Sequence, residues 1–451
     1  MEIKKLVLKI KKEELSLGIF ESNLESKLDK YWANFRIKFF YDYLKHVGTL
    51  TPKSEFENLG GWNLFKYLFH IIFNSSLIRL LFGKYDYLIL GSSRGKLVDP
   101  YSDDISRSLG KSQITLAQSN TRDYYKKVVY IDMIKIFAKI YAQLACILKP
   151  SSRRKIPQEL FARFDDIPQE KFVAKFIKSS YEFDFMYKMY SCILRRMKVK
   201  QVFVVVGYYN LPLIIAARNL GIKTTEIQHG VVTPYHISYS FNEGALKKYC
   251  FADNLFTMGE YWGRACLLPR DVVVNNVGNN YFVCDKAKSI NKDNRKILFI
   301  SQTTIFEHIV EFINVNLDTL SEYELIFKLH PNEFSRKEYI VNTLMTSEWS
   351  GLNLTVVTTQ NTLSELQDFC AIQIGIYSTG IFEGLQKGCF TLIIPGPGIS
   401  YLEDLIKRQL VRFYDDKVEL STQLNSFQKN IGMRFFEKFS VSKLNRMVVN
   451  D

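Results

Sequence analysis

Between residues 296 and 394, apolar strand patterns alternate with helical patterns, and this alternation constrains the fold more than any other feature. The expected strands are residues 296–301, 324–329, 352–358, 371–376 and 389–394. The expected helices are residues 305–320, 362–369 and 378–386. Strands that are apolar on both faces are typical of parallel sheets covered by helices. This part of the chain is therefore predicted to be a doubly wound α/β domain.

A second, less regular series of the same kind lies in the first half of the chain. Its expected strands are residues 85–91, 201–206 and 223–227. Residues 210–220 have helical spacing, and residues 102–195 carry mostly helical patterns. The predicted fold class is α/β, with two Rossmann-like domains that face a cleft.

The polar segment 278–296 has no periodicity and is interpreted as the linker between the domains. It divides the chain into an N-terminal domain with helical insertions over residues 1–280 and a C-terminal domain over residues 290–415. Residues 416–451 are expected to form a helical tail that packs back on the first domain.

The charge balance favours anionic partners. The chain has 451 residues, with 60 Lys and Arg against 46 Asp and Glu, a net charge of +14. Such an excess suits phosphorylated substrates, anionic lipid or nucleic acid. No nucleic-acid-binding motif is present, so lipid or glycan phosphate is preferred. Seven scattered cysteines without a CxxC pair fit a reducing cytoplasm and predict no zinc site.

The N-terminus lacks the long apolar core of a signal peptide, and a soluble or peripheral protein is expected. The apolar run 62–82 contains Lys66, His70 and Arg79, which argue against a spanning helix. Residues 62–84 fit an amphipathic helix on an anionic membrane, and they fit a core helix equally well.

The sharpest motif follows the strand 371–376 and opens the next helix. Ser378 and Thr379 stand where exposed N–H groups and the helix dipole attract a phosphate. Glu383, one turn later, is placed to bind ribose hydroxyls. An ordinary N-cap with Glu in an early turn explains the same residues.

Two histidines follow other strands. His330 and Pro331 end the strand 324–329, at the edge where open α/β sheets bind ligands, so His330 is a candidate phosphate contact. His229, before Gly230, follows the strand 223–227 and is the candidate general base. Glu243 is the second candidate for the base. A structural His in a turn is the alternative for both histidines.

A serine-rich loop after the strand 85–91 is a candidate acceptor-binding site. Ser92, Ser93 and Arg94 suit an anionic acceptor, although a purely structural loop fits as well. The glycine spacing does not match a Walker phosphate loop. No Asp-x-Asp occurs in the sequence, so neither a metal nor another cofactor is expected.

Together these motifs resemble a family. Residues 328–333 and 375–388 resemble the donor-binding half of GT-B glycosyltransferases of bacterial capsule and lipopolysaccharide assembly. Residues 226–236 resemble an acceptor-domain motif of capsule enzymes, including Kdo transferases and, more loosely, teichoic-acid polymerases. His330-Pro331 and Ser378-Thr379 match paired elements of bacterial sialyltransferases. Gln228-His229-Gly230 stands where those enzymes have an acidic residue before Gly.

The resemblance covers roughly residues 200–415. It implies a metal-independent transfer from a nucleotide-sugar donor to a surface polysaccharide or lipid-linked glycan, at the inner face of the plasma membrane. Ser378, Thr379, His330 and Pro331 would then hold the donor phosphates and Glu383 the ribose. A non-hydrolysing nucleotide-sugar 2-epimerase and a non-catalytic glycan- or nucleotide-binding assembly partner remain as alternatives.

Overall fold

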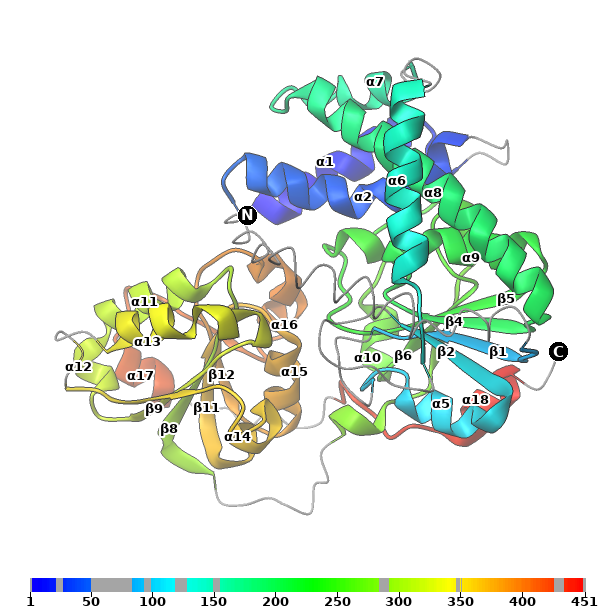
Figure 1. The fold of residues 1–451 in the computed structure, drawn as a ribbon. Helices are drawn as coiled ribbons and strands as arrows, with labels where there is room; N and C mark the ends of the chain where they lie inside the picture. The colour runs from blue at the N-terminus through cyan, green and yellow to red at the C-terminus, as the bar shows by residue number, and fades with distance from the viewer. Residues whose placement is uncertain are drawn as a thin grey trace. The chain divides into compact units, whose positions relative to one another are not determined.

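A computed structural model describes residues 2–21, 27–49, 83–92, 99–117, 128–148, 155–283, 292–345, 349, 351–425 and 434–448. The chain divides into two compact units (Figure 1). The first domain comprises Leu6–Tyr281 and Lys438–Asp451, and the second comprises Met1–Lys5 and Phe282–Glu437. Each contains one parallel sheet flanked by helices, so the prediction of two Rossmann-like domains is confirmed.

The first domain is built on a parallel sheet in the order β3-β2-β1-β4-β5-β6-β7, all drawn from the described residues. Its strands are β1 (Tyr87–Leu90), β2 (Gln113–Ala117), β3 (Val128–Tyr130), β4 (Gln201–Val205), β5 (Lys223–Ile227), β6 (Asn254–Thr257) and β7 (Val273–Asn276). The helices are α1 (Glu2–Ser16), α2 (Lys27–His46), α5 (Asp103–Leu109), α6 (Asp132–Leu148), α7 (Lys155–Phe161), α8 (Gln169–Met197), α9 (Leu211–Asn219), α10 (Glu260–Arg264) and α18 (Val441–Val448). The strand order reverses between β1 and β4, the place where such sheets bind ligands.

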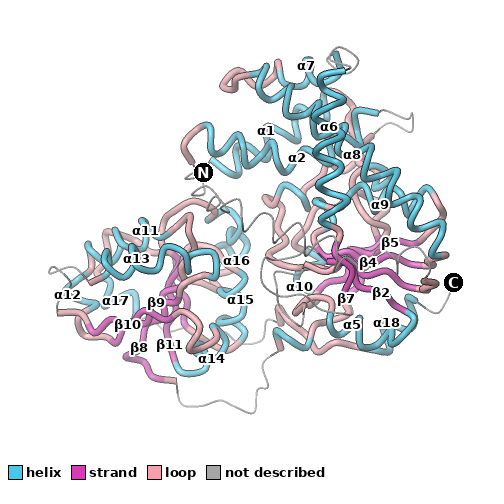
Figure 2. Tube along the Cα trace, viewed as in Figure 1, coloured by secondary structure: helices cyan, strands magenta, loops and turns pink. Residues whose placement is uncertain are grey.

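The second domain repeats this topology with the sheet order β10-β9-β8-β11-β12-β13 (Figure 2). Its strands are β8 (Asp293–Ile300), β9 (Glu324–Lys328), β10 (Asn353–Val357), β11 (Cys370–Gly375), β12 (Phe390–Ile393) and β13 (Arg412–Phe413). The helices are α11 (Phe306–Val315), α12 (Leu317–Leu320), α13 (Lys337–Leu344), α14 (Leu363–Phe369), α15 (Thr379–Gln386), α16 (Glu403–Lys407) and α17 (Leu420–Asn425). Here the order reverses between β8 and β11.

Every strand expected from the sequence is present within three residues of its expected bounds. Sequence reasoning missed β2 and β3, which lie inside the region expected to be mostly helical, and also β6, β7 and β13. The linker prediction is wrong at its end, because β8 already begins at Asp293. The side chains of its first residues are exposed, while its backbone pairs with β11.

The single helix expected over residues 305–320 is two helices that meet at Asn316. The Asn316 side-chain amide donates to the Phe312 carbonyl oxygen at 2.8 Å, in competition with the helical backbone. The C-terminal segment, expected to pack on the first domain as one tail, is shared between the two domains. Leu420 and Leu424 of α17 belong to the core of the second domain, whereas Leu444 of α18 packs into the core of the first.

Helix α15 is fastened to β11 by buried amide groups. The Gln373 side chain donates to the Ile381 carbonyl at 2.9 Å, and Gln367 donates to the Gly380 carbonyl at 2.7 Å. A third bond, 3.0 Å long, joins the two amides. Gly384 permits this approach, since a Cβ atom there would lie 2.0 Å from Gln373 Oε1. The β11–α15 turn is thus fixed by the helix packing behind it.

Gly384→Ala is expected to destabilise the second domain. The added methyl group displaces the Gln373 amide from its buried hydrogen bonds, and overpacking of this kind costs about 1–3 kcal/mol. Thermal or urea unfolding measures the loss. Gly351→Ala is the control, because a Cβ atom there meets nothing within 4 Å. Equal stability of the two variants would contradict the packing described.

Candidate functional site

The backbone after β4 turns sharply at the point where the first sheet reverses its order. Val206 has a left-handed φ of 61°, and the Asn210 side-chain amide donates to the Val206 carbonyl at 3.1 Å. Gly207 follows, and its N–H donates to Glu226 Oε1 at 3.2 Å. A Cβ atom at Gly207 would lie 2.4 Å from Glu226 Oε2, so only glycine lets this carboxyl group come so close. The turn serves to enclose Glu226.

Glu226 lies on β5, and only 1% of it is exposed. The Tyr239 hydroxyl donates to Glu226 Oε1 at 2.6 Å. Burial raises the pKa of Glu226 to about 7, against the opposing effects of the bonds from Tyr239 and Gly207. A carboxyl group that changes charge near neutral pH at a sheet edge is typical of acid–base sites. Sequence reasoning missed Glu226. The one hint in the sequence was the presence of an acidic residue inside a strand expected to be buried.

His229 extends this arrangement. Its Nε2 lies 3.1 Å from the Tyr208 hydroxyl, and its Nδ1 lies 3.4 Å from the Tyr239 hydroxyl. Because the Tyr239 O–H donates to Glu226, the phenol oxygen is left to accept a hydrogen bond from the Nδ1–H of His229. The neutral imidazole then has its lone pair on Nε2. We call Glu226, Tyr239, His229 and Tyr208 the carboxyl–phenol–imidazole cluster.

Both ends of the His229 loop are held by hydrogen bonds. Gln228 donates to the Gly230 carbonyl at 2.8 Å and accepts from the Met258 N–H at 2.9 Å. Farther on, the buried Arg36 side chain donates to the carbonyls of Ile237 and Ser240, which flank Tyr239. An imidazole fixed by a third group is the arrangement of triad-type general bases.

The other residues expected in the first domain lie outside this cluster. Glu243 is exposed, and no hydrogen bond among the described residues joins it to the cluster. Ser92 donates from its N–H and its hydroxyl to the two oxygens of Asp99, at 2.8 and 2.9 Å, and so shapes the turn after β1. Ser93 and Arg94 lie outside the described residues, as does most of the segment 62–84.

In the second domain, Ser378 and Thr379 lie where the sequence predicts, between β11 and α15. Ser378 caps the helix, since its hydroxyl accepts from the Gly380 N–H at 3.1 Å. The preceding Tyr377 is tied to the loop after β8. Its carbonyl accepts from Gln302 at 2.9 Å, and its hydroxyl bonds Thr304 at 2.9 Å. The loops after β8 and β11 are thus joined where the strand order reverses.

His330 follows β9 and begins a short 3₁₀ turn with Pro331 in its first position. Its Nδ1 accepts from the Asn332 N–H at 3.1 Å, so a neutral ring carries its proton on Nε2 and can donate it to a ligand. Its backbone N–H donates to Glu333 at 2.8 Å. Glu333 is fully buried, also accepts from Ser301 at 2.9 Å, and has its pKa raised by burial. Sequence reasoning did not find Glu333, which fixes His330.

Glu383 lies on α15, one turn after Thr379. Burial raises the pKa of Glu383 to about 7, and the positive charge of Lys387 opposes that rise. A neutral carboxyl group is a hydrogen-bond donor as well as an acceptor. Glu383 is therefore suited to a polyhydroxyl ligand. β9, β8 and β11 are neighbours, so His330, Gln302 and Ser378 follow adjacent strands at one edge of the sheet.

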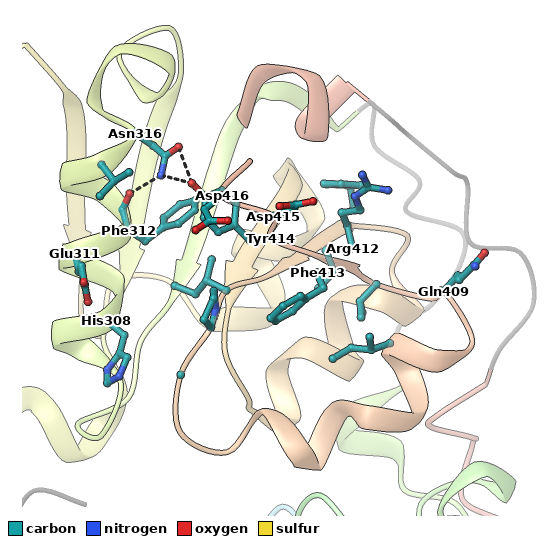
Figure 3. A pocket seen from close by; sticks show the side chains of 18 of the residues that line it. His308, Glu311, Phe312, Asn316, Gln409, Arg412, Phe413, Tyr414, Asp415 and Asp416 are labelled. Carbon is teal, nitrogen blue, oxygen red and sulfur yellow. Dashed lines mark hydrogen bonds between the residues drawn. The ribbon is translucent and has the colours of Figure 1, made fainter. Parts of the chain in front are cut away.

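A separate cavity of about 1170 Å³ is present in the second domain (Figure 3). It is bounded by α11, β12 and residues 409–416, with His308, Arg412 and Asp415 among its lining. Pro395 and Gly396 also line it. His330, Ser378, Thr379 and Glu383 do not, so the expected donor residues and this cavity are separate features.

The described residues also show how the chain stands with respect to metal binding and membrane spanning. No group of three or more His, Cys, Asp or Glu side chains there could hold a metal ion. Within the same ranges, no helix is long and apolar enough to cross a membrane.

Comparison of the sequence with models of protein families and with curated proteins finds no match. Among solved structures, UDP-GlcNAc 2-epimerase from Methanocaldococcus jannaschii, in complex with UDP-GlcNAc and UDP, is similar with 11% identity and a TM-score of 0.49, over 81% of this chain and 99% of that one. Acinetobacter baumannii MurG is similar with 11% identity and a TM-score of 0.41, over 76% and 89% of the two chains. The glycosyltransferase SnogD from Streptomyces nogalater is similar with 10% identity and a TM-score of 0.38, over 74% and 87%.

His330→Ala and Glu383→Ala are each expected to weaken nucleotide binding. The first removes the N–H donor of an imidazole ring whose orientation is fixed, and the second removes a carboxyl group from the helix that follows the turn at Ser378. Losing a hydrogen bond to a charged group costs about 1.5–3 kcal/mol, roughly 10- to 100-fold in affinity. Isothermal titration with nucleoside diphosphates measures it, with exposed Glu338→Ala as the control. Unchanged affinity in both variants would remove the assignment.

Proposed function

We propose that the protein is a metal-independent glycosyltransferase of the GT-B type that uses a nucleotide-sugar donor. The observation that carries the proposal is the carboxyl–phenol–imidazole cluster, which holds the imidazole after β5 against Tyr208, which follows β4 at the reversal point of the first sheet. The polar edge of the second sheet, with Ser378, His330 and Glu383, suits the donor nucleotide. A base in one Rossmann-like domain and a nucleotide in the other is the division of roles that this function needs.

The chemistry follows from the orientation of His229. An acceptor hydroxyl takes the place of Tyr208 at Nε2 and gives its proton to the ring. The acceptor oxygen then bonds to the anomeric carbon, and the bond from that carbon to the donor phosphate breaks. The nucleotide leaves with the electron pair. Tyr239 and Glu226 stabilise the imidazolium, as the third member of a triad does.

The leaving nucleotide gains negative charge as the sugar departs. N–H groups at the start of α15 and the Nε2–H of His330 are preorganised donors for that charge. Fixed donors of this kind supply a large part of transition-state stabilisation in many enzymes. The proposed reaction needs neither a metal nor another cofactor, because these dipoles take the place of a cation.

The proposed acceptor is a growing surface polysaccharide or a lipid-linked glycan of capsule or lipopolysaccharide assembly. Motif resemblance in residues 200–415 and a net charge of +14 support it. The same charge supports a cytoplasmic enzyme held peripherally at the inner face of the plasma membrane, with no nucleic acid as partner. Residues 62–84 are one proposed contact with that membrane.

The reaction is tested by incubating the protein with CMP-, UDP-, GDP- and dTDP-sugars, with and without bacterial glycolipid extract. A transferase releases nucleotide from one of these donors, and the release increases with extract. A 2-epimerase changes the sugar of the donor without net release and without extract. Epimerisation, or inactivity towards every donor, would overturn the proposal.

His229→Ala is expected to reduce turnover by roughly 10²–10⁴-fold, the usual contribution of a general base. Tyr239→Phe should reduce turnover as well, because Nδ1 loses the hydroxyl group that links it to Glu226. Donor affinity should hardly change, since the nucleotide contacts lie in the other domain. Tyr209→Phe is the control, because this neighbouring tyrosine is 51% exposed. A loss of donor affinity that matches the loss of turnover would make His229 a ligand contact.

A further inference from the structure

Helix α6 (Asp132–Leu148) packs with its small side chains. Ala138, Ala142 and Ala145 are buried, and the last two meet Ile177 and Tyr181 of α8. In a soluble helix the large apolar side chains normally face the core. Alanine brings the two helices close, but it buries little apolar area. The position of α6 beside α8 is visible in Figure 1.

Six large apolar side chains of α6 lie away from these buried alanines, with Tyr141 at the boundary in ring contact with Tyr181 and Phe185 of α8. They are 39–77% exposed and recur at helical spacing: Phe137, Ile140, Tyr141, Leu144, Ile147 and Leu148. We call these six residues the α6 stripe. Exposure increases towards the end of the helix, where Ile147 and Leu148 are the most exposed. Contiguous apolar surface of this kind marks an interaction site.

The charged residues of α6 and of the sequence that follows it are mostly basic. Lys135 and Lys139 belong to the helix, and Lys149, Arg153, Arg154 and Lys155 follow it in the sequence. The only acidic residue of the helix, Asp132, is buried at its start. Two copies meeting through this stripe would bring like charges together, whereas an anionic surface would neutralise them.

We propose that the α6 stripe inserts into the interface of an anionic lipid bilayer, with Lys135 and Lys139 of the same helix at the headgroups. An amphipathic helix lying in that interface buries its apolar face by roughly 5–10 Å. An anionic lipid bilayer suits both features, because its acyl chains accommodate the apolar side chains and its headgroups attract the basic ones. This inference rests on the peripheral placement in the proposed function, and it is independent of the transfer chemistry.

The test is flotation of the full chain with vesicles of phosphatidylglycerol and phosphatidylcholine at low salt. The variant Leu144→Glu/Ile147→Glu/Leu148→Glu is expected to bind more than about tenfold more weakly, since each inserted side chain contributes about that factor. The control Leu15→Glu/Met345→Glu/Val441→Glu changes the charge equally at exposed apolar residues outside α6, and should bind better than the α6 variant. Phosphatidylcholine alone, or high salt, should weaken binding of the wild type.

Each possible result of the flotation experiment supports or overturns a stated part of the inference. Equal flotation of the α6 variant and its control would overturn the role of the α6 stripe while leaving a membrane contact elsewhere. No flotation of the wild type would overturn this inference and the peripheral placement together, whereas donor-dependent nucleotide release would still support the transferase. A wild-type dimer that the variant converts to a monomer would identify a protein interface instead. If the glutamate variant fails to fold, Ile147→Ser/Leu148→Ser replaces it, with the same expected direction.

Discussion

The buried ion pair between Glu14 and Arg36 is the interaction on which the first domain depends. The two side chains are 1% and 3% exposed, and Arg36 Nε lies 2.5 Å from Glu14 Oε1. Trp32 donates to the same carboxyl oxygen at 2.6 Å. The guanidinium then reaches the carbonyls on either side of Tyr239. A pair of charges thus joins α1 and α2 to the loop that carries the cluster.

The buried ion pair between Glu14 and Arg36 holds the loop in place because breaking it is costly in free energy. Removing one member of a buried pair leaves an uncompensated charge and costs about 3–5 kcal/mol. The loop therefore has little freedom to adopt another conformation while the domain is folded. Tyr239 is held against Glu226 by groups that take no part in the chemistry. In the second domain, neutral groups fix the corresponding turn: the side-chain amides of Gln367 and Gln373 hold α15 and the turn that precedes it.

Sequence patterns identified the architecture because parallel sheets buried on both faces leave long apolar runs, as in β4, β9 and β11. Those patterns failed for β2 and β3, which lie among helices, and for the short strands β6, β7 and β13. In the site, strand ends pointed to His229, His330 and Ser378. They did not point to Glu226 or Glu333, since a buried carboxyl group has meaning only through partners distant in the chain. Gly207 and Tyr239 are such partners, and only the folded chain brings them together.

The central claim is that Glu226 acts through Tyr239 on the imidazole of His229. Burial raises the pKa of Glu226 from 4.5 to about 7 in the folded protein, so the carboxylate forms as the pH rises through about 7. The ionised form is the one that stabilises an imidazolium. The direct measurement is kcat/KM against pH for the wild type and Glu226→Gln, since this profile reports groups of the free enzyme. The account predicts that the wild-type profile rises through about pH 7 and that the variant has a lower profile without that rise. A variant that keeps the wild-type inflection and plateau would contradict it.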